Sequence, residues 1–167
     1  MPAMLACTDV HYREHDAHGA ALFFRAWTDA VAADRRTVRV PAPREYRPGH
    51  FYERELPVLL ALLKDAPPLE AIVVDGYVWL GAAGEKGLGA HLFDALGGKI
   101  PVIGVAKTAY RGSDFAERVV RGEGKRPLFV TAVGIDPRVA AERVRAMHGA
   151  HRIPTLLGEV DRLARSG

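Results

Sequence analysis

The sequence predicts an α/β fold in which an antiparallel three-strand meander leads into βα units, with helices packed on one mixed sheet. Three observations support this prediction. Near the N-terminus, three apolar or alternating runs at residues 4–8, 20–27 and 37–40 are separated only by short polar segments, as in a meander. Near-continuous apolar runs at 71–74 and 101–105 are typical of buried strands in parallel sheets. Stretches of helical composition alternate with these later runs, which is the order of βα units.

The individual elements follow in chain order. The first strand ends on Asp9, and the polar segment at 13–19, which finishes in glycine, is expected to be a turn. Prolines then interrupt regular structure until a helix predicted at 58–63, directly after Pro57. The remaining expected elements are a helix at 88–96, a short helix at 113–121 with Ser113 as its N-cap, a strand at 128–133, and helices at 137–148 and 155–165.

Length and composition indicate one globular domain spanning residues 1–167, because no repeat or linker divides the chain. A content of 49% hydrophobic and 26% charged residues excludes a disordered or collagen-like protein. The single cysteine, Cys7, excludes an intrachain disulfide and a cysteine-based zinc site. No apolar run has the length of a membrane span and no signal peptide is evident, so a cytoplasmic protein without membrane contact is expected. The net charge of +3 allows an anionic partner without identifying one.

Three acidic residues stand out by their position. Asp9 and Asp75 follow apolar strands, and Glu55 lies at the start of the first helix. Active sites of open α/β sheets gather outside the carboxyl ends of the strands, so these carboxylates could converge there. Such a group of oxygen donors suits Mg²⁺ or Mn²⁺ and the phosphoryl chemistry that these ions support. Each acid taken alone is more simply explained as a turn or helix-capping residue.

Other features are compatible with binding of a nucleic acid. Lys107 follows the strand at 101–105 and could touch a phosphate, although a solvated charge is the simpler explanation. Residues 46–49, Tyr-Arg-Pro-Gly, form a rigid turn whose ring could wedge between bases or simply pack in a loop. The glycines at 84–89 match neither a Walker motif nor a dinucleotide fingerprint, and they are better suited to close approach of a flat ligand.

Taken together, these blocks resemble the endonuclease V family. The resemblance rests on Asp-Val-His-Tyr at 9–12, on Tyr-Arg-Pro-Gly and Arg-Glu-Leu-Pro within 46–57, on Val-Val-Asp-Gly at 73–76 followed by 87–92, and on Gly-Val-Ala-Lys within 101–108. A weaker match is Arg-Ile-Pro-Thr at 152–155. The blocks cover nearly the whole chain, and the second to fourth are the specific ones.

The resemblance implies an RNase H-like fold and an Mg²⁺-dependent endonuclease that acts in nucleic-acid repair. Such an enzyme hydrolyses a phosphodiester 3′ to a deaminated adenine, inosine, in DNA or RNA, after flipping the base into a pocket. Inosine-containing nucleic acid is thus the implied partner, and no obligate protein partner is expected. The implied site has catalytic Asp9, Glu55, Asp75 and Lys107, a metal held by the three acids with Mn²⁺ able to substitute, a strand-separating wedge of Tyr46, Pro48 and Gly49, and a lesion pocket with Gly76, Gly87 and Gly89.

The chain departs from the family pattern in two places that bear on function. Where the family has a Gly-His pair after the strand that begins at Leu128, this chain has Gly134-Ile135, and the following Asp136 could at best replace the imidazole. The loop at 77–81, which contains Trp79, lacks the histidine usual after the Asp-Gly. Two alternatives therefore stay open: a catalytically weakened nucleic-acid-binding protein of the same fold, and an RNase H-like nuclease for branched or flapped DNA.

Overall fold

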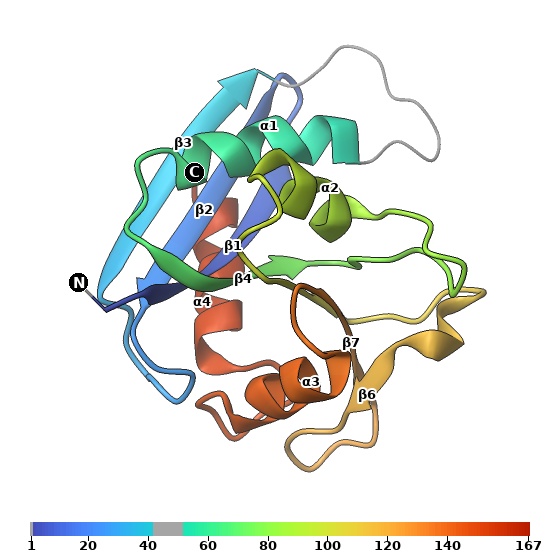
Figure 1. Ribbon diagram of the computed structural model, residues 1–167. Coiled ribbons are helices and arrows are strands. Elements are labelled where there is room, and N and C mark those ends of the chain that lie inside the picture. Colours follow the sequence, from blue (N-terminus) through green and yellow to red (C-terminus); the bar gives the residue numbers. More distant parts are fainter. Residues whose placement is uncertain (1, 42–51) are drawn as a thin grey trace.

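The computed structural model describes residues 2–41 and 52–167 (Figure 1). In these residues, an N-terminal run of three strands is followed by alternating helices and strands up to residue 106, and then by two strands and two helices. The elements are β1 (Met4–Tyr12), β2 (Asp16–Phe24), β3 (Asp34–Pro41), α1 (Tyr52–Leu63), β4 (Leu69–Asp75), α2 (Leu88–Ala95), β5 (Val102–Ala106), a 3-10 turn (Ser113–Phe115), β6 (Glu117–Val119), β7 (Leu128–Val133), α3 (Pro137–Ala146) and α4 (Thr155–Arg165).

The strands form one seven-stranded sheet in the order β3-β2-β1-β4-β5-β7-β6. Strands β1, β2 and β3 are antiparallel, as the meander predicts, and β4 and β5 run parallel to β1. Strand β7 runs antiparallel to β5 and to β6, so the last strands add a hairpin and not a further parallel βα unit. The predicted mixed sheet is confirmed, with this change at its far edge.

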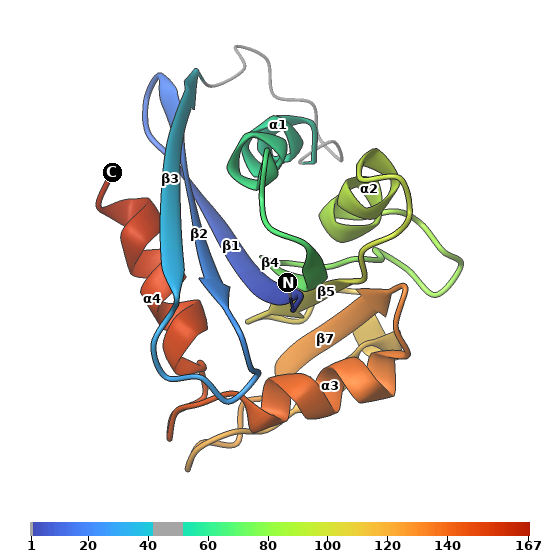
Figure 2. The same cartoon turned by 60° about the vertical axis from the view of Figure 1, so that its left-hand side comes forward.

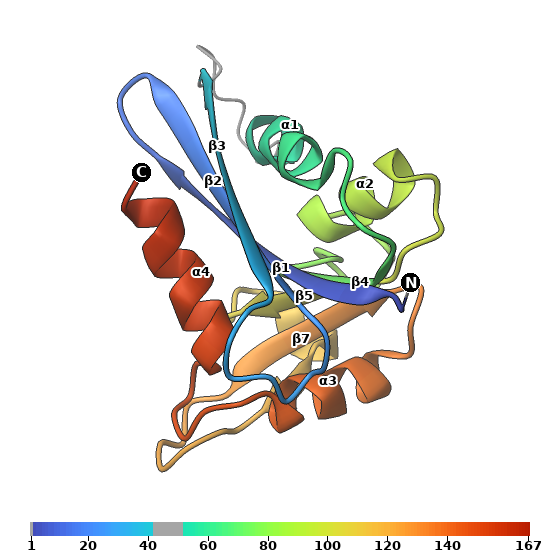
Figure 3. The same ribbon diagram turned by 90° about the vertical axis from the view of Figure 1, so that its left-hand side faces the viewer.

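The helices cover both faces of the sheet, α1 and α2 on one and α3 and α4 on the other (Figures 2 and 3). Alternation along the central strands supplies both cores, because successive side chains of a strand point to opposite faces. On β4, for example, Val73 packs toward α3 and α4, whereas Ile72 and Val74 pack toward α1 and α2. None of the helices in the described part of the chain is long and apolar enough to cross a membrane.

Tertiary packing extends β2 and α1 beyond their predicted bounds. The turn predicted at 13–19 is wrong, because β2 already begins at Asp16 and Gly19 lies inside it. Gly19 sits under α1 so closely that a Cβ there would lie 2.5 Å from Cγ1 of Val58. Helix α1 begins at Tyr52 and therefore contains Pro57, which lies past the first turn and, without an N–H, cannot donate the usual helical hydrogen bond.

The helix predicted at 113–121 is also wrong. Only a 3-10 turn forms at Ser113–Phe115, and β6 follows at once. The Ser113 hydroxyl donates to the Tyr110 carbonyl oxygen over 2.7 Å, so it closes the preceding turn instead of capping a helix. Val119 is fully buried beside β7, and strand pairing of this β-branched residue outweighs the weak helical preference of the segment.

Gly104 on β5 holds the loop after Asp75 against the sheet. A Cβ at this position would lie 2.5 Å from the Gly76 carbonyl oxygen and 2.9 Å from the Val78 nitrogen. We expect Gly104→Ala to lower the free energy of unfolding by about 1–3 kcal/mol, since neighbouring backbone must shift. Urea unfolding measures this loss. Gly124→Ala is the matched control, because nothing lies within 4 Å of its Cβ, and an equal loss in both variants would contradict the packing argument.

Candidate functional site

Asp9 and Asp75 lie side by side at one edge of the sheet. Strands β1 and β4 are parallel with Cys7 opposite Val73, and each aspartate comes two residues later on the same face. On the next strand, Val105 is opposite Asp75, and Lys107 follows two residues later. The register therefore brings three predicted site residues to the carboxyl ends of neighbouring strands, on the face covered by α4.

Helix α4 adds a fourth charged residue, Asp161, which the sequence analysis missed. One pocket is lined by Asp9, Asp75, Lys107 and Asp161. Arg165, one turn further along the helix, donates from Nε to Oδ1 of Asp161 over 3.2 Å. In the sequence, Asp161 directly follows Val160, a buried residue of the amphipathic helix α4. An acid in this position usually lies at the edge of the solvent-exposed face, so it did not indicate a site.

The carboxylates of this pocket perturb one another. Burial raises the pKa of Asp9 well above its usual range, and a hydrogen bond with Asp161 and the charge of Asp75 raise it further. Burial also raises the pKa of Asp75, although the charge of Lys107 partly opposes this. Burial acts in the same direction on Asp161, but its hydrogen bonds with Asp9 and Arg165 outweigh it and lower its pKa. The pocket thus disfavours simultaneous ionisation of its carboxylates.

Glu55 reaches the same region from the opposite face of the sheet. It lies in the first turn of α1, where the sequence predicts it. Burial and the charge of Asp75 raise the pKa of Glu55 to about 7, and the charge of Arg54 partly opposes them. Glu55 is therefore close enough to Asp75 to interact electrostatically, although it does not line the pocket that contains Asp161.

The chemistry of these residues fits a hard divalent cation. Neighbouring carboxylates whose ionised forms repel one another are stabilised by a cation, and oxygen donors suit Mg²⁺ or Mn²⁺. Within residues 2–41 and 52–167, no three His, Cys, Asp or Glu side chains are grouped so that they could hold a metal ion together. Mg²⁺ does not require such a group of three, because it is usually bound by one or two carboxylates together with water and substrate phosphates.

The glycines predicted to line a lesion pocket follow Asp75 closely in the structure. Gly76 has a φ of +128°, a conformation that favours glycine, and lies directly after the carboxylate. At Gly87 a Cβ would lie 2.5 Å from the Tyr77 carbonyl oxygen, and at Gly89 2.6 Å from Cγ2 of Val78. The last two glycines are thus already required by packing of α2 against the loop. The predicted wedge residues Tyr46, Pro48 and Gly49 lie outside the described residues.

Asp136 is not brought to the carboxylates. Strand β7 is antiparallel to β5, with Val133 opposite Val102, so the residues after β7 lie at the opposite end of the sheet from Asp75. Asp136 is the N-cap of α3 and accepts a hydrogen bond from the Arg138 backbone N–H over 2.9 Å. The neighbouring Ile135 packs against the core on the α3 and α4 face.

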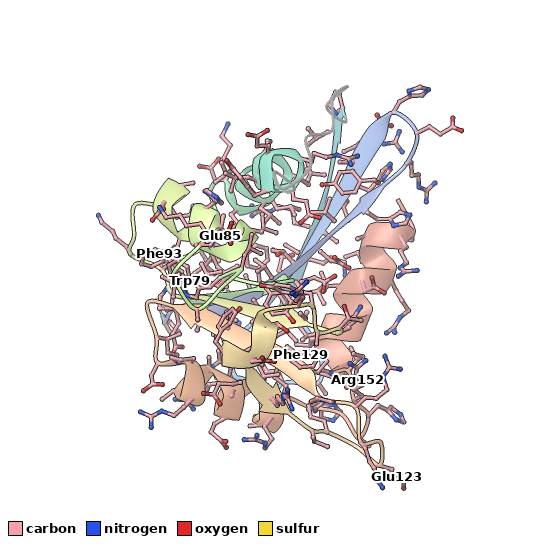
Figure 4. All side chains as sticks on the ribbon, turned by 90° about the vertical axis from the view of Figure 1, so that its right-hand side faces the viewer. Trp79, Glu85, Phe93, Glu123, Phe129 and Arg152 are labelled. Atoms are coloured by element: carbon pink, nitrogen blue, oxygen red, sulfur yellow. The ribbon has the colours of Figure 1, made fainter. Side chains whose placement is uncertain are left out.

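The loop at 77–81 is fastened to β7. The Val78 N–H donates to Oγ1 of Thr131 over 2.8 Å, and the Trp79 indole donates from Nε1 to the Ala132 carbonyl oxygen over 2.9 Å. The indole therefore lies against the sheet, in the position labelled in Figure 4. This segment, which departs from the expected motif, is held in place by hydrogen bonds to a core strand.

A comparison with protein families identifies the chain. The family model described as Endonuclease V matches residues 2–144. The chain belongs to the endonuclease V family. A relative named Endonuclease V from Xylella fastidiosa (strain 9a5c) is 36% identical over 119 residues, which are 70% of this chain and 48% of that protein. Another from Nocardia farcinica is 32% identical over 146 residues, 75% of this chain and 63% of that protein. The chain thus spans about half to two thirds of the length of these endonuclease V relatives.

Solved endonuclease V structures share the architecture. The crystal structure of the Streptomyces avermitilis protein has a TM-score of 0.75 at 26% identity and covers 98% of this chain and 80% of that one. The Ciona intestinalis protein, solved in complex with a 24mer DNA containing an inosine followed by a ribo-adenosine, has a TM-score of 0.80 at 18% identity and covers 98% and 84%. The predicted RNase H-like fold is therefore confirmed.

Proposed function

We propose that this protein is a divalent-metal-dependent endonuclease that hydrolyses a phosphodiester 3′ to inosine in DNA or RNA, in a repair role. The observation that carries the proposal is the convergence of Asp9, Asp75, Asp161 and Lys107 on one pocket. Membership of the endonuclease V family supports a nuclease, and the inosine-containing DNA bound to the Ciona relative supports the substrate.

Each charged residue has a distinct part in this reaction. Asp9 and Asp75 would hold the metal ion together with water and phosphate oxygens, and Glu55 would add a ligand from the opposite face of the sheet. The ion would activate water and polarise the phosphate. Asp161 has a lowered pKa, stays ionised at neutral pH and can accept a proton at its carboxylate. Lys107 carries a positive charge at the pocket wall, where it neutralises charge that develops on the phosphate oxygens.

The position of Ile135 argues against a protein that only binds nucleic acid. That alternative depends on the missing histidine, but Ile135 follows β7 at the opposite end of the sheet from Asp75. Replacing an imidazole there leaves the group of Asp9, Asp75 and Asp161 unaltered. The geometry therefore supports hydrolysis more strongly than binding alone.

A panel of end-labelled substrates tests the proposed reaction. The wild-type protein is incubated with Mg²⁺ and with Mn²⁺ on strands that contain one inosine, on matched strands with adenine, and on flap and junction DNA. We expect nicking of the inosine strands, as DNA and as RNA, above all other substrates. A preference for flaps or junctions would favour the branched-DNA nuclease, and tight binding without any nicking would favour the binding protein.

Asp161 and Asp136 form a matched pair for testing which fourth acid takes part. We expect Asp161→Asn to slow nicking of the inosine strand by about 10²-fold or more, because it removes a proton acceptor from the pocket. Asp136→Asn removes an equal charge at the exposed start of α3 and should leave the rate unchanged. Single-turnover rates at saturating protein measure both effects. The assignment is wrong if Asp136→Asn is the slower variant.

A further inference from the structure

Lys107 also lines a second hollow, whose lining contains none of the carboxylates Asp9, Asp75 and Asp161. This hollow, called here the arginine hollow, is lined by Lys107, Thr108, Arg126, Phe129 and Arg152. It lies where the end of β5, the start of β7 and the segment before α4 meet. Lys107 lines both hollows. A nucleic-acid strand bound across Lys107 would therefore extend from the carboxylates to the two arginines.

Arg152 is fixed in this hollow by backbone carbonyl groups. Its guanidinium donates from Nε to the Arg126 carbonyl oxygen over 3.1 Å, and from Nη2 to the carbonyl oxygens of Pro127 (2.9 Å) and Lys107. All of these acceptors are uncharged, so the guanidinium keeps its full positive charge. An arginine that is already immobilised loses little conformational entropy when it binds an anion.

Two like charges are held together here without a neutralising acid. Arg126 and Arg152 line the same hollow. Burial lowers the pKa of Arg152, and the nearby charge of Arg126 lowers it further. Across the described ranges, neither arginine forms an ion pair with Asp, Glu or the C-terminus. Glu123 belongs to the connection between β6 and β7, as Arg126 does, but it lies at the tip of this connection. Phe129 and Arg152 lie nearer to the body of the fold (Figure 4).

We propose that the arginine hollow binds a phosphodiester group of the nucleic-acid strand, next to the one that lies at the carboxylates. The carbonyl groups take Nε and Nη2 of Arg152, so its Nη1 and the Arg126 guanidinium are the groups that can donate to phosphate oxygens. The apolar ring of Phe129 also lines the hollow and offers no competing acceptor. The inference rests on the proposed function in one respect only, namely that the ligand of the adjacent pocket is a polynucleotide.

Binding without cleavage tests the hollow separately from the reaction. Dissociation constants are measured in EDTA for a single-stranded DNA, with and without one inosine, over a range of NaCl concentrations. Arg126 is exposed, so Arg126→Ala should fold normally. We expect weaker binding of both strands by the same factor, and a log–log salt slope smaller by about 0.7, the value for one lost phosphate contact on a single strand. Arg143→Ala, an equal charge change on exposed α3, should bind like the wild type.

The outcomes separate this inference from the proposed function. Unchanged affinity and salt slope in Arg126→Ala overturn the hollow, as does an equal loss in Arg143→Ala, even if the wild type nicks inosine strands. A loss confined to Arg126→Ala supports the hollow even if no strand is nicked in Mg²⁺ or Mn²⁺, and in that case the proposed reaction alone fails. Arg152→Lys provides a second check, because it keeps the charge and should retain more of the salt slope than Arg152→Met.

Discussion

Asp75→Asn is expected to abolish nicking of inosine-containing strands while leaving the protein folded. Asp75 lies between Asp9 and Lys107 at the carboxyl end of β4, and its carboxylate is a proposed metal ligand. A bound metal contributes several kcal/mol to stabilisation of the transition state, so the rate should fall by at least about 10³-fold. Single-turnover nicking in Mg²⁺ measures the loss.

Asp75→Asn should lose activity without losing stability. Burial raises the pKa of Asp75, which means that the folded protein disfavours its charged form. The neutral amide should therefore raise the free energy of unfolding of the metal-free protein at pH 8, or at least not lower it. Urea unfolding in EDTA checks this. A variant that loses both activity and stability would indicate structural damage and contradict the proposed role.

The second large effect is on the pH dependence of stability. The pKa of Glu55 is about 7 in the folded protein, above the usual value for glutamate of about 4.3. The folded state therefore binds more protons than the unfolded state between these values. The contribution of Glu55 to the free energy of unfolding is therefore present at low pH and is lost as the pH rises through about 7. Between pH 5.5 and pH 8, the loss from Glu55 should amount to about 2 kcal/mol in EDTA.

Comparison with Glu55→Gln isolates this effect from other titrating groups. Burial lowers the pKa of His18, so this residue favours stability at higher pH and opposes Glu55 in the same window. Asp9 acts in the same direction as Glu55 because its pKa is also raised. Urea unfolding at pH 5.5 and pH 8 should show a smaller decrease for Glu55→Gln than for the wild type. Equal decreases in the two proteins would show that Glu55 is not perturbed as described.

Addition of Mg²⁺ should remove part of the loss at pH 8. A cation pairs with ionised carboxylates and competes with protons for them, so it stabilises the folded protein more at pH 8 than at pH 5.5. The same unfolding measurements with and without Mg²⁺ give the difference. Stabilisation that is independent of pH, or that is retained in a variant carrying both Asp9→Asn and Asp75→Asn, would contradict binding at these residues.

The parts of the site that follow local sequence patterns could be predicted. Asp75 comes after four apolar residues and before Gly76. This local pattern predicts a carboxylate at the end of a buried strand and does not depend on how the strands pair. Strand direction is different, because it depends on pairing between distant segments. The sequence after Leu128 predicts a strand, but only its antiparallel pairing with β5 carries Asp136 away from the carboxylates.

Residues that act through tertiary contacts could not be predicted from one sequence. Asp161 belongs to an amphipathic helix, and nothing local distinguishes it from the solvent-facing acid Glu142 on α3. Only the packing of α4 on β1 and β2 brings Asp161 to Asp9. Similarly, the segment after Ser113 has an ambiguous local preference, and the open edge of β7 decides that it pairs as β6.

Mapping the cleavage position on one inosine-containing duplex tests the proposed hydrolysis 3′ to inosine. The strand carrying inosine is labelled at its 5′ end and incubated with the wild-type protein in Mg²⁺, beside an identical duplex with adenine and beside the Asp75→Asn variant. We expect one nick on the 3′ side of inosine, made by the wild type alone. Nicking of the adenine duplex at the same rate, equal nicking by Asp75→Asn, or no nick with either Mg²⁺ or Mn²⁺ would contradict the proposed hydrolysis.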